Sequence, residues 1–455
     1  MWDKIDAAVD VWDRAPRLPL CFLGFGLLWF WGCLGINMIA NETASISMLS
    51  ATPLYQDVYV LFQIVGLVTS ALLARRGPLM YSPRIMVGST GAAMLASILV
   101  VVGGQVVLPS ALLFAASALL GMTYGLLFAL WVELCGRFPG VKMLIPYLTA
   151  TMSYFALSIV SHYVDVIVNH GAFLASPLLM LWCLLLARRA TPDTSEPGRD
   201  AALLPWQIML AIVVFSAVFD ITGGFVQYST TSVLVRVGRI ALILALFSLA
   251  KFRTSFDFTL LYNIVVAVMI AGLFASLVAV KGSLLEQIVV QAGAESFSLL
   301  IYVICCSYAY RMRVSAASVY GLATAVNLGV RFVVEKSSPL VATWLPLSMV
   351  SMVLCAACIL VLVLLLNKSF LVAQVQPLPP RRKSRAQLAE EYAGSIGLSP
   401  QEQLVLVELL EGHTTAQAAD NLFISQSTVR VHQSSIYKKA GVHSRDELLG
   451  VVLGL

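Results

Sequence analysis

The chain is a succession of long apolar runs separated by short polar segments. About twelve of these runs reach the roughly 20 residues that an α-helix needs to cross a bilayer. They centre near Trp29, Val65, Ile98, Leu120, Phe155, Leu181, Phe215, Ile243, Val268, Leu299, Val326 and Cys358. With 59% hydrophobic and 12% charged residues, most of the chain lies outside the range of soluble globular proteins. The sequence therefore predicts an all-α fold, a polytopic membrane bundle of about twelve transmembrane helices.

A polar, proline-bearing segment at residues 188–200 divides the apolar part into two halves of six runs, 1–190 and 201–370. This six-plus-six layout resembles that of the major facilitator superfamily, which implies a transporter-like domain over residues 1–370. Transporters of that superfamily carry a loop after the second helix with glycine, aspartate and cations. The corresponding loop here, residues 75–84, has the cations and lacks the aspartate. The missing aspartate favours a domain that has lost the transport cycle. The six-plus-six architecture does not by itself imply transport, because one fold can serve several functions.

The distribution of cations predicts the orientation of the bundle. With a cytoplasmic N-terminus, fifteen lysines and arginines fall on the inner side and five on the outer side or its boundary, as the positive-inside rule requires. An even number of crossings also places the C-terminus inside. The first apolar run has the length of a span and lacks a convincing cleavage site. We therefore expect a multi-pass protein of the cytoplasmic membrane, with the lipid bilayer as a partner and both termini in the cytoplasm.

Polar residues inside apolar spans are candidates for a binding site, because each costs free energy unless it is paired or faces water. The candidates for binding an unknown small-molecule ligand are Gln63, Glu133, Asp220, Gln227, Asn263, Glu295, Asn327 and Arg331. Glu295 and Arg331 are expected to pair or to hold a charged group between them. Gly223 and Gly224, which follow Asp220, are expected to break their helix. The alternative is that these residues only link helices or face the mouth of the bundle.

Residues 371–398 read as a cytoplasmic connector. A proline-rich stretch at 374–380 predicts an extended spacer, and the cationic residues at 381–385 fit either a contact with anionic lipid or an additional contact with DNA. Residues 386–396 are expected to form a short helix that separates the last domain from the membrane.

Residues 399–455 read as a small domain of four helices. Ser399, Thr414 and Ser444 each begin a capping box, Ser425 can cap a third helix over Gln426–Ala440, and Gly412 can end the first. In the third helix one face carries Val429, His432, Ile436 and Ala440. The opposite face carries hydroxyls, cations and one apolar side chain, as expected of a helix in a major groove: Ser427, Arg430, Val431, Ser434 and Lys438. In the last helix Leu448, Leu449 and Val452 are candidate dimer contacts.

These residues resemble the LuxR-type helix-turn-helix domain of bacterial transcription regulators. The family pattern is followed without gaps from Leu398 and Glu402 through Gly412, Thr428-Val429 and Val431-His432 to Glu447-Leu448. The resemblance implies double-stranded DNA as a partner, with base and phosphate contacts at Arg430, Val431 and Ser434 and a further phosphate contact at Lys438. Departures at Ala418, Ser434 and Ala440 suggest a thinner core and weaker contacts.

Charge predicts that a single head binds DNA poorly. From residue 399 to the end, four cations face six carboxylates, a net charge of minus two, and most affinity for DNA comes from neutralising phosphates. A homodimer on DNA is therefore expected.

Together these features predict a membrane-embedded one-component transcription regulator that senses a small molecule and binds promoter DNA. One alternative is a major-facilitator-like transporter with a regulatory tail, and another is a tail that serves only in protein interaction or anchoring. The eight cysteines all lie in or beside apolar runs and read as buried apolar residues. No nucleophile-base arrangement, phosphate-binding loop or metal-ligand cluster stands out in the sequence, so we expect no enzymatic activity, no cofactor and no metal.

Overall fold

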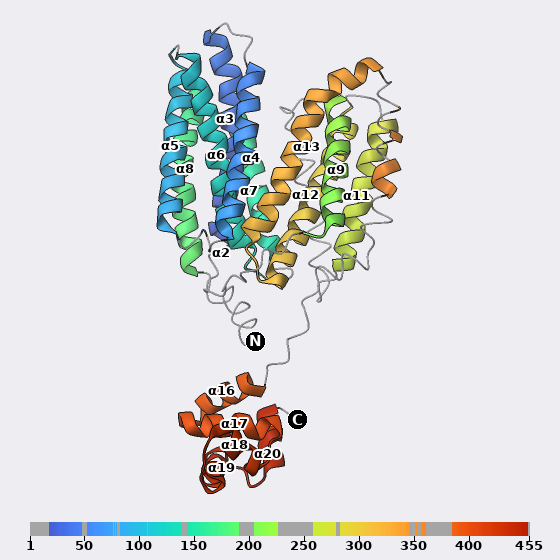
Figure 1. The fold of residues 1–455 in the computed structure, drawn as a ribbon. Coiled ribbons are helices and arrows are strands. Elements are labelled where there is room, and N and C mark those ends of the chain that lie inside the picture. Colours follow the sequence, from blue (N-terminus) through green and yellow to red (C-terminus); the bar gives the residue numbers. More distant parts are fainter. Residues whose placement is uncertain are drawn as a thin grey trace. The chain divides into compact units, whose positions relative to one another are not determined.

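The computed structural model describes residues 18–47, 52–75, 77, 79, 82–106, 108–138, 143–190, 204–225, 258–278, 283–344, 349, 352–353, 356–360 and 385–453. The chain divides into two compact units, Met1–Pro377 and Leu378–Leu455. All regular secondary structure in the described residues is helical, as the sequence predicted (Figure 1).

The first unit is a bundle of apolar helices. Its elements are α2 (Leu18–Cys21), α3 (Leu23–Ser47), α4 (Thr52–Ala74), α5 (Pro83–Gly103), α6 (Ser110–Cys135), α7 (Leu144–Tyr163), α8 (Val166–Ala190), α9 (Trp206–Phe225), α11 (Phe258–Val278), α12 (Leu284–Met312) and α13 (Ala316–Trp344). Among the described residues, 7 helices are long and apolar enough to cross a membrane, and α3 and α9 contribute shorter apolar stretches. A multi-pass membrane protein is compatible with this finding, and the predicted number of twelve spans is not confirmed.

Most of the predicted span centres lie inside these helices. The centres from Trp29 to Phe215 lie in α3 to α9, and those at Val268, Leu299 and Val326 lie in α11, α12 and α13. The centre at Ile243 and most of the predicted linker lie outside the described residues. Cys358 lies in a short helical stretch, residues 356–360.

Helices α4 and α6 approach each other closely because glycines line their contact. A Cβ atom at Gly125 would lie 2.7 Å from the carbonyl oxygen of Gln63, and one at Gly121 would lie 3.0 Å from the amide nitrogen of Gln63. Gly121 and Gly125 are four residues apart on α6, the small-residue spacing that lets helices pack backbone to backbone in a membrane. Because Gly121 and Gly125 have no side chains, the backbones of α4 and α6 can lie this close together.

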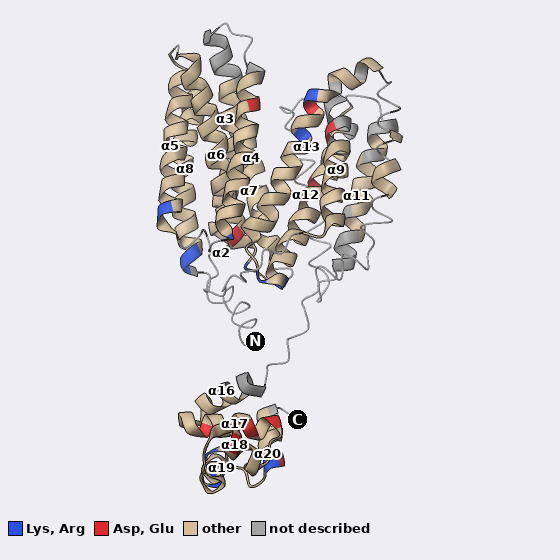
Figure 2. Cartoon of the chain, viewed as in Figure 1, with Lys and Arg blue, Asp and Glu red and all other residues tan. Residues whose placement is uncertain are grey.

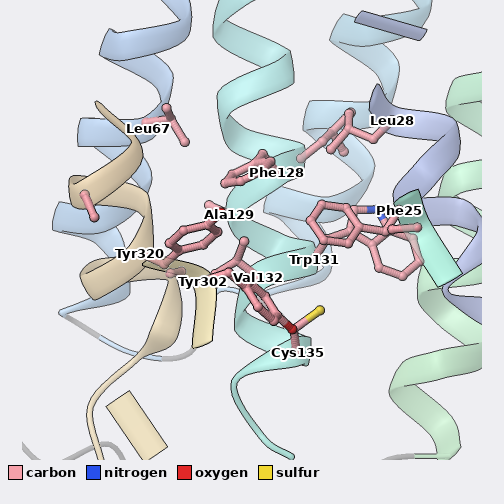
Figure 3. Packing of buried hydrophobic residues seen from close by; sticks show 14 of the residues in the cluster. Phe25, Leu28, Leu67, Phe128, Ala129, Trp131, Val132, Cys135, Tyr302 and Tyr320 are labelled. Carbon is pink, nitrogen blue, oxygen red and sulfur yellow. The ribbon is translucent and has the colours of Figure 1, made fainter. Parts of the chain in front are cut away.

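Aromatic residues join the two halves of the bundle at the end where α6 terminates (Figure 3). The ring of Phe128 on α6 lies 5.7 Å from that of Tyr320 on α13, and Tyr320 lies 5.6 Å from Tyr302 on α12. The hydroxyl of Tyr302 donates a buried hydrogen bond of 2.8 Å to the carbonyl oxygen of Met143, just before α7. Packing of this kind is worth about 0.5–1.5 kcal/mol per aromatic pair beyond simple burial.

An ion pair joins the halves near the opposite end. Lys336, late in α13, lies 2.6 Å from a carboxylate oxygen of Asp57, early in α4. At the other end of the bundle Lys and Arg gather on the last turn of α8, at Arg188 and Arg189, and on the last turn of α12, at Arg311 (Figure 2). The cations thus collect at the end that the sequence predicted to face the cytoplasm.

The second unit is a small helical head with its own core. Its helices are α16 (Arg385–Ile396), α17 (Pro400–Glu411), α18 (Thr415–Leu422), α19 (Gln426–Ala440) and α20 (Arg445–Leu453). The core includes Leu406, Leu409, Val429, Ile436 and Leu448, each at most 1% exposed.

The head begins earlier than the sequence predicted. Helix α16 packs against α17 and α20, and its Ala389 and Ala393 are buried in the core of the head. The predicted boundary at residues 398 and 399 assigned this helix to the connector. The structure instead makes α16 part of the head, because two alanines on one face allow it to lie close to its neighbours.

The predicted caps determine where the helices of the head begin and end. Ser399 with Glu402 and Thr414 with Gln417 form complete capping boxes, and Gly412 ends α17 in the left-handed conformation at φ 96°. Ser444 is a partial exception. Its hydroxyl accepts a hydrogen bond from the amide of Glu447, whereas the Glu447 carboxylate accepts from the amide of His443, not from that of Ser444.

Candidate DNA interface and intramembrane polar site

Helices α18 and α19 form the helix-turn-helix element of the head. Helix α18 ends at Leu422, and the capping residue Phe423 takes the left-handed conformation at φ 55°. The hydroxyl of Ser425 then accepts a hydrogen bond of 3.1 Å from the amide of Thr428 to start α19. Val429 and Ile436 are fully buried on the inner side of α19, and His432 and Ala440 are half-buried. The inner face of α19 is therefore fixed against the core.

The opposite face of α19 is open to solvent. All five predicted DNA contacts are exposed there: Ser427, Arg430, Val431, Ser434 and Lys438. Val431 is 68% exposed, although it is apolar, which suits contact with a thymine methyl group. The face therefore offers two cations, two hydroxyls and one apolar side chain.

The four cations of the last four helices divide into two kinds. Lys439 lies 2.7 Å from Glu402, and Arg445 donates a hydrogen bond of 2.7 Å to the carbonyl oxygen of Leu409, so both stabilise the head itself. Arg430 and Lys438 have no ion pair or hydrogen bond with the described part of the chain. Of these four cations, Arg430 and Lys438 on α19 remain available for phosphate.

Glu402 is the polar centre of the head. Its side chain accepts hydrogen bonds from Lys439, Ser435 and the amide of Ser399, at 2.7, 2.6 and 2.7 Å. Led by Lys439, these donors lower the pKa of the buried carboxyl group from 4.5 to about 2. The glutamate expected only to close a capping box therefore also ties α17 to α19.

A group of possible metal ligands was missed in the sequence. One ligand atom each from Glu408, Glu411 and His413 lies within 4.8 Å of the others. The same Glu408 oxygen already contacts His413 Nδ1 at 2.7 Å and accepts a hydrogen bond from Asn421 at 2.8 Å. These bonds link α17, the following turn and α18, and they account for the grouping without an ion.

The predicted dimer contacts on α20 lie largely inside the head. Leu448 is 1% exposed and Val452 is 8% exposed, and both belong to the core, whereas Leu449 packs partly against it. Val451 is 55% exposed on the same helix. A contact between two heads through α20 would therefore have to use Val451 and the open side of Leu449, because the other two side chains already pack within one head.

In the bundle, Arg331 pairs with Asp220 and not with Glu295 as expected. The guanidinium Nε of Arg331 on α13 lies 2.9 Å from Oδ1 of Asp220 on α9. The second carboxylate oxygen of Asp220, Oδ2, is buried without a hydrogen-bond partner among the described residues. The expected break at Gly223 and Gly224 is wrong, because α9 continues through both residues to Phe225.

The remaining ligand candidates lie on several helices. Asn327, one turn before Arg331 on α13, is half-buried, and Gln63 is buried at the middle of α4. Glu133 lies two residues before the end of α6, and Asn263 is exposed near the start of α11. Gln227 lies outside the described residues. The structure thus brings Asp220 and Arg331 together and places Glu133 and Asn263 near helix ends.

Comparisons with known proteins agree with the geometry of the head. A family model described as bacterial regulatory proteins, luxR family, matches residues 397–452. The response regulator protein TmoT of Ectopseudomonas mendocina is 41% identical over 73 residues, which make up 16% of this chain and 33% of that relative. The chain thus spans about a third of the length of this relative. The C-terminal head is therefore a LuxR-type helix-turn-helix domain.

Proposed function

We propose that the protein is a membrane-embedded one-component transcription regulator. The apolar bundle lies in the bacterial cytoplasmic membrane with both termini in the cytoplasm, senses a small molecule and controls the binding of the head to promoter DNA. The protein is then a regulator and not an enzyme. The observation that carries the proposal is the joining, in one chain, of a LuxR-type head with an exposed cationic face and 7 helices suited to cross a bilayer.

The head acts in pairs in this proposal. Two free cations, Arg430 and Lys438, give one head little affinity for phosphate, because affinity grows with the number of phosphates neutralised. Two heads on neighbouring half-sites double that number and place two recognition helices about one turn of DNA apart.

The bundle controls pairing through a shift between two conformations. A ligand that binds one conformation better by about 3 kcal/mol changes the ratio of the two by roughly 150-fold. The segment that joins the two units then transmits the change to the head.

Mapping of bound DNA tests the proposal. The full-length chain is expressed in a bacterial host, bound DNA is crosslinked and sequenced, and wild type is compared with Arg430→Ala/Lys438→Ala. We expect discrete sites in wild type and their loss in the double variant, because the free cations of α19 are removed.

Gln401→Ala, an exposed position on α17, is the matched control and should keep all sites. Sites that persist in the double variant would show that the head uses another surface. A protein without bound sites that takes up solutes into vesicles would favour the transporter alternative.

A further inference from the structure

Arg331 lies midway along the length of α13. It is fifteen residues after the start of α13 at Ala316 and thirteen before its end at Trp344. At about 1.5 Å per residue, it lies roughly 20 Å from either end of the helix. A cation at this depth of a span costs several kcal/mol unless it is paired or faces water.

The pair with Asp220 uses only one edge of the guanidinium. Nε of Arg331 lies 2.9 Å from Oδ1 of Asp220, and Oδ2 has no partner in the described residues, so the contact is not bidentate. The terminal nitrogens of Arg331 make no hydrogen bond with the described part of the chain, and the side chain is 57% exposed. A half-exposed cation at mid-span is stable where it faces a water-filled cavity and not lipid.

We propose that the two terminal nitrogens of Arg331 bind the carboxylate of the sensed molecule. A guanidinium presents these nitrogens as a planar fork that matches the two oxygens of a carboxylate. Asp220 acts as a positioning residue, since its bond to Nε orients the fork. The depth of Arg331 excludes lipid phosphates, which remain at the membrane surface.

The surrounding charges select a ligand with a single negative charge. Asp220 is bonded to Arg331, and Glu335 follows one helical turn later on α13, where side chains four residues apart are neighbours. These carboxylates repel a second negative charge on the ligand. The site therefore favours a ligand with one carboxylate over a ligand with two.

This inference rests on the proposed sensing function, and chemical modification tests it without using DNA. The full-length protein in membranes is treated with phenylglyoxal, which reacts with accessible arginine forks, and modification of each arginine is followed by mass spectrometry. The probes are 100 mM acetate, the simplest monocarboxylate, and 100 mM acetamide, its neutral analogue. The exposed Arg84 and Arg430 are internal references.

We expect Arg331 to react, and acetate but not acetamide to slow its reaction. For a Kd of about 50 mM, mass action predicts that 100 mM acetate slows the reaction about threefold. Arg84 and Arg430 should react equally with either probe. An unreactive Arg331, or equal rates with acetate and acetamide, would overturn the site.

Binding of ¹³C-labelled acetate, observed by saturation-transfer NMR, provides a second measurement. Wild type should give a signal that Arg331→Gln loses and Arg331→Lys weakens, because lysine keeps the charge but lacks the fork. An unchanged signal in Arg331→Gln would also overturn the site. If acetate does not bind at Arg331 but the DNA sites are found, the carboxylate site is wrong and the proposed regulator function is unaffected. If acetate binds but no DNA sites are found, the regulator function is wrong and the carboxylate site is unaffected.

Discussion

At the scale of single residues, two adjacent lysines of the head have different roles. Lys438 is exposed to solvent, and the adjacent Lys439 is bonded to Glu402. The sequence placed Lys438 on the DNA-facing side of its helix, but it did not indicate that Lys439 binds Glu402, because that contact depends on which side of α19 faces α17. That choice is made by the burial of Val429 and Ile436.

Glu402 makes the stability of the head depend on acid. Its pKa is lowered from 4.5 to about 2, so its contribution is fully present above the pKa of the unfolded state and is lost as the pH falls from about 4.5 through 2. Glu402→Gln removes charge-assisted hydrogen bonds, and we expect the free energy of unfolding at pH 7 to fall by about 1–3 kcal/mol.

Urea unfolding of residues 378–455 between pH 7 and 2 measures both effects. The wild-type and Glu402→Gln curves should converge toward pH 2, where the wild-type carboxyl group is becoming protonated. Parallel curves over the whole range would show that Glu402 is not the titrating group. Gln401→Ala, exposed one position earlier, should follow wild type.

At the scale of elements, the contact between α4 and α6 depends on Gly125. A methyl group there would lie 2.7 Å from the Gln63 carbonyl oxygen, so Gly125→Ala must push two backbones apart. We expect the protein to be destabilised by about 1–3 kcal/mol, the usual cost of overpacking. Thermal inactivation of the detergent-solubilised protein measures this destabilisation.

Gly91 on α5 is the matched control, because nothing lies within 4 Å of a Cβ atom built there. Gly91→Ala should leave the inactivation temperature unchanged or raise it. Equal effects of the two substitutions would mean that α4 and α6 do not approach closely through glycine.

Helix α16 should contribute to the stability of the head. Ala393 is 3% exposed within the core, and Ala393→Leu forces three extra carbon atoms between α16 and its neighbours. We expect the free energy of unfolding of residues 378–455 to fall by about 1–3 kcal/mol. Gly394→Ala, at an exposed position of the same helix, should be neutral or stabilising by up to about 1 kcal/mol. Chemical denaturation distinguishes the two, and an unaffected Ala393→Leu would assign α16 to the connector.

The elements of the head were largely predictable from sequence, and the exceptions have physical reasons. Caps are local, so Ser399, Thr414 and Gly412 indicated the ends of their helices correctly. Packing between distant segments is not local. The burial of α16 and the choice of Asp220 as the partner of Arg331 depend on how helices meet, which their own residues do not encode.

At the scale of the whole molecule, DNA affinity should depend on how many heads are held together. Residues 378–455 contain eight lysines and arginines against eight carboxylates, so one head has no net charge to attract DNA. We expect the isolated head to bind operator DNA weakly and a coiled-coil-fused dimer of it to bind far more tightly. Fluorescence anisotropy at several salt concentrations measures this.

The salt dependence identifies the residues that bind phosphate. The slope of log K against log salt is negative, and its magnitude decreases by about 0.9 for each phosphate that is no longer neutralised. Lys438→Ala should therefore decrease the magnitude of the slope by about 0.9 per head. Equal affinity of monomer and fused dimer would argue against paired binding.

The two ends of the bundle respond to different properties of their surroundings. Where α6 ends, the halves are held by aromatic rings and a buried hydrogen bond, and dissolved ions scarcely affect such interactions. At the other end they are held by Lys336 and Asp57, whose side chains are 41% and 23% exposed. Ions screen charges beyond about 8 Å at physiological strength and weaken exposed pairs further as salt rises. A rise in salinity would therefore loosen the end held by Lys336 and Asp57 and leave the aromatic end unchanged.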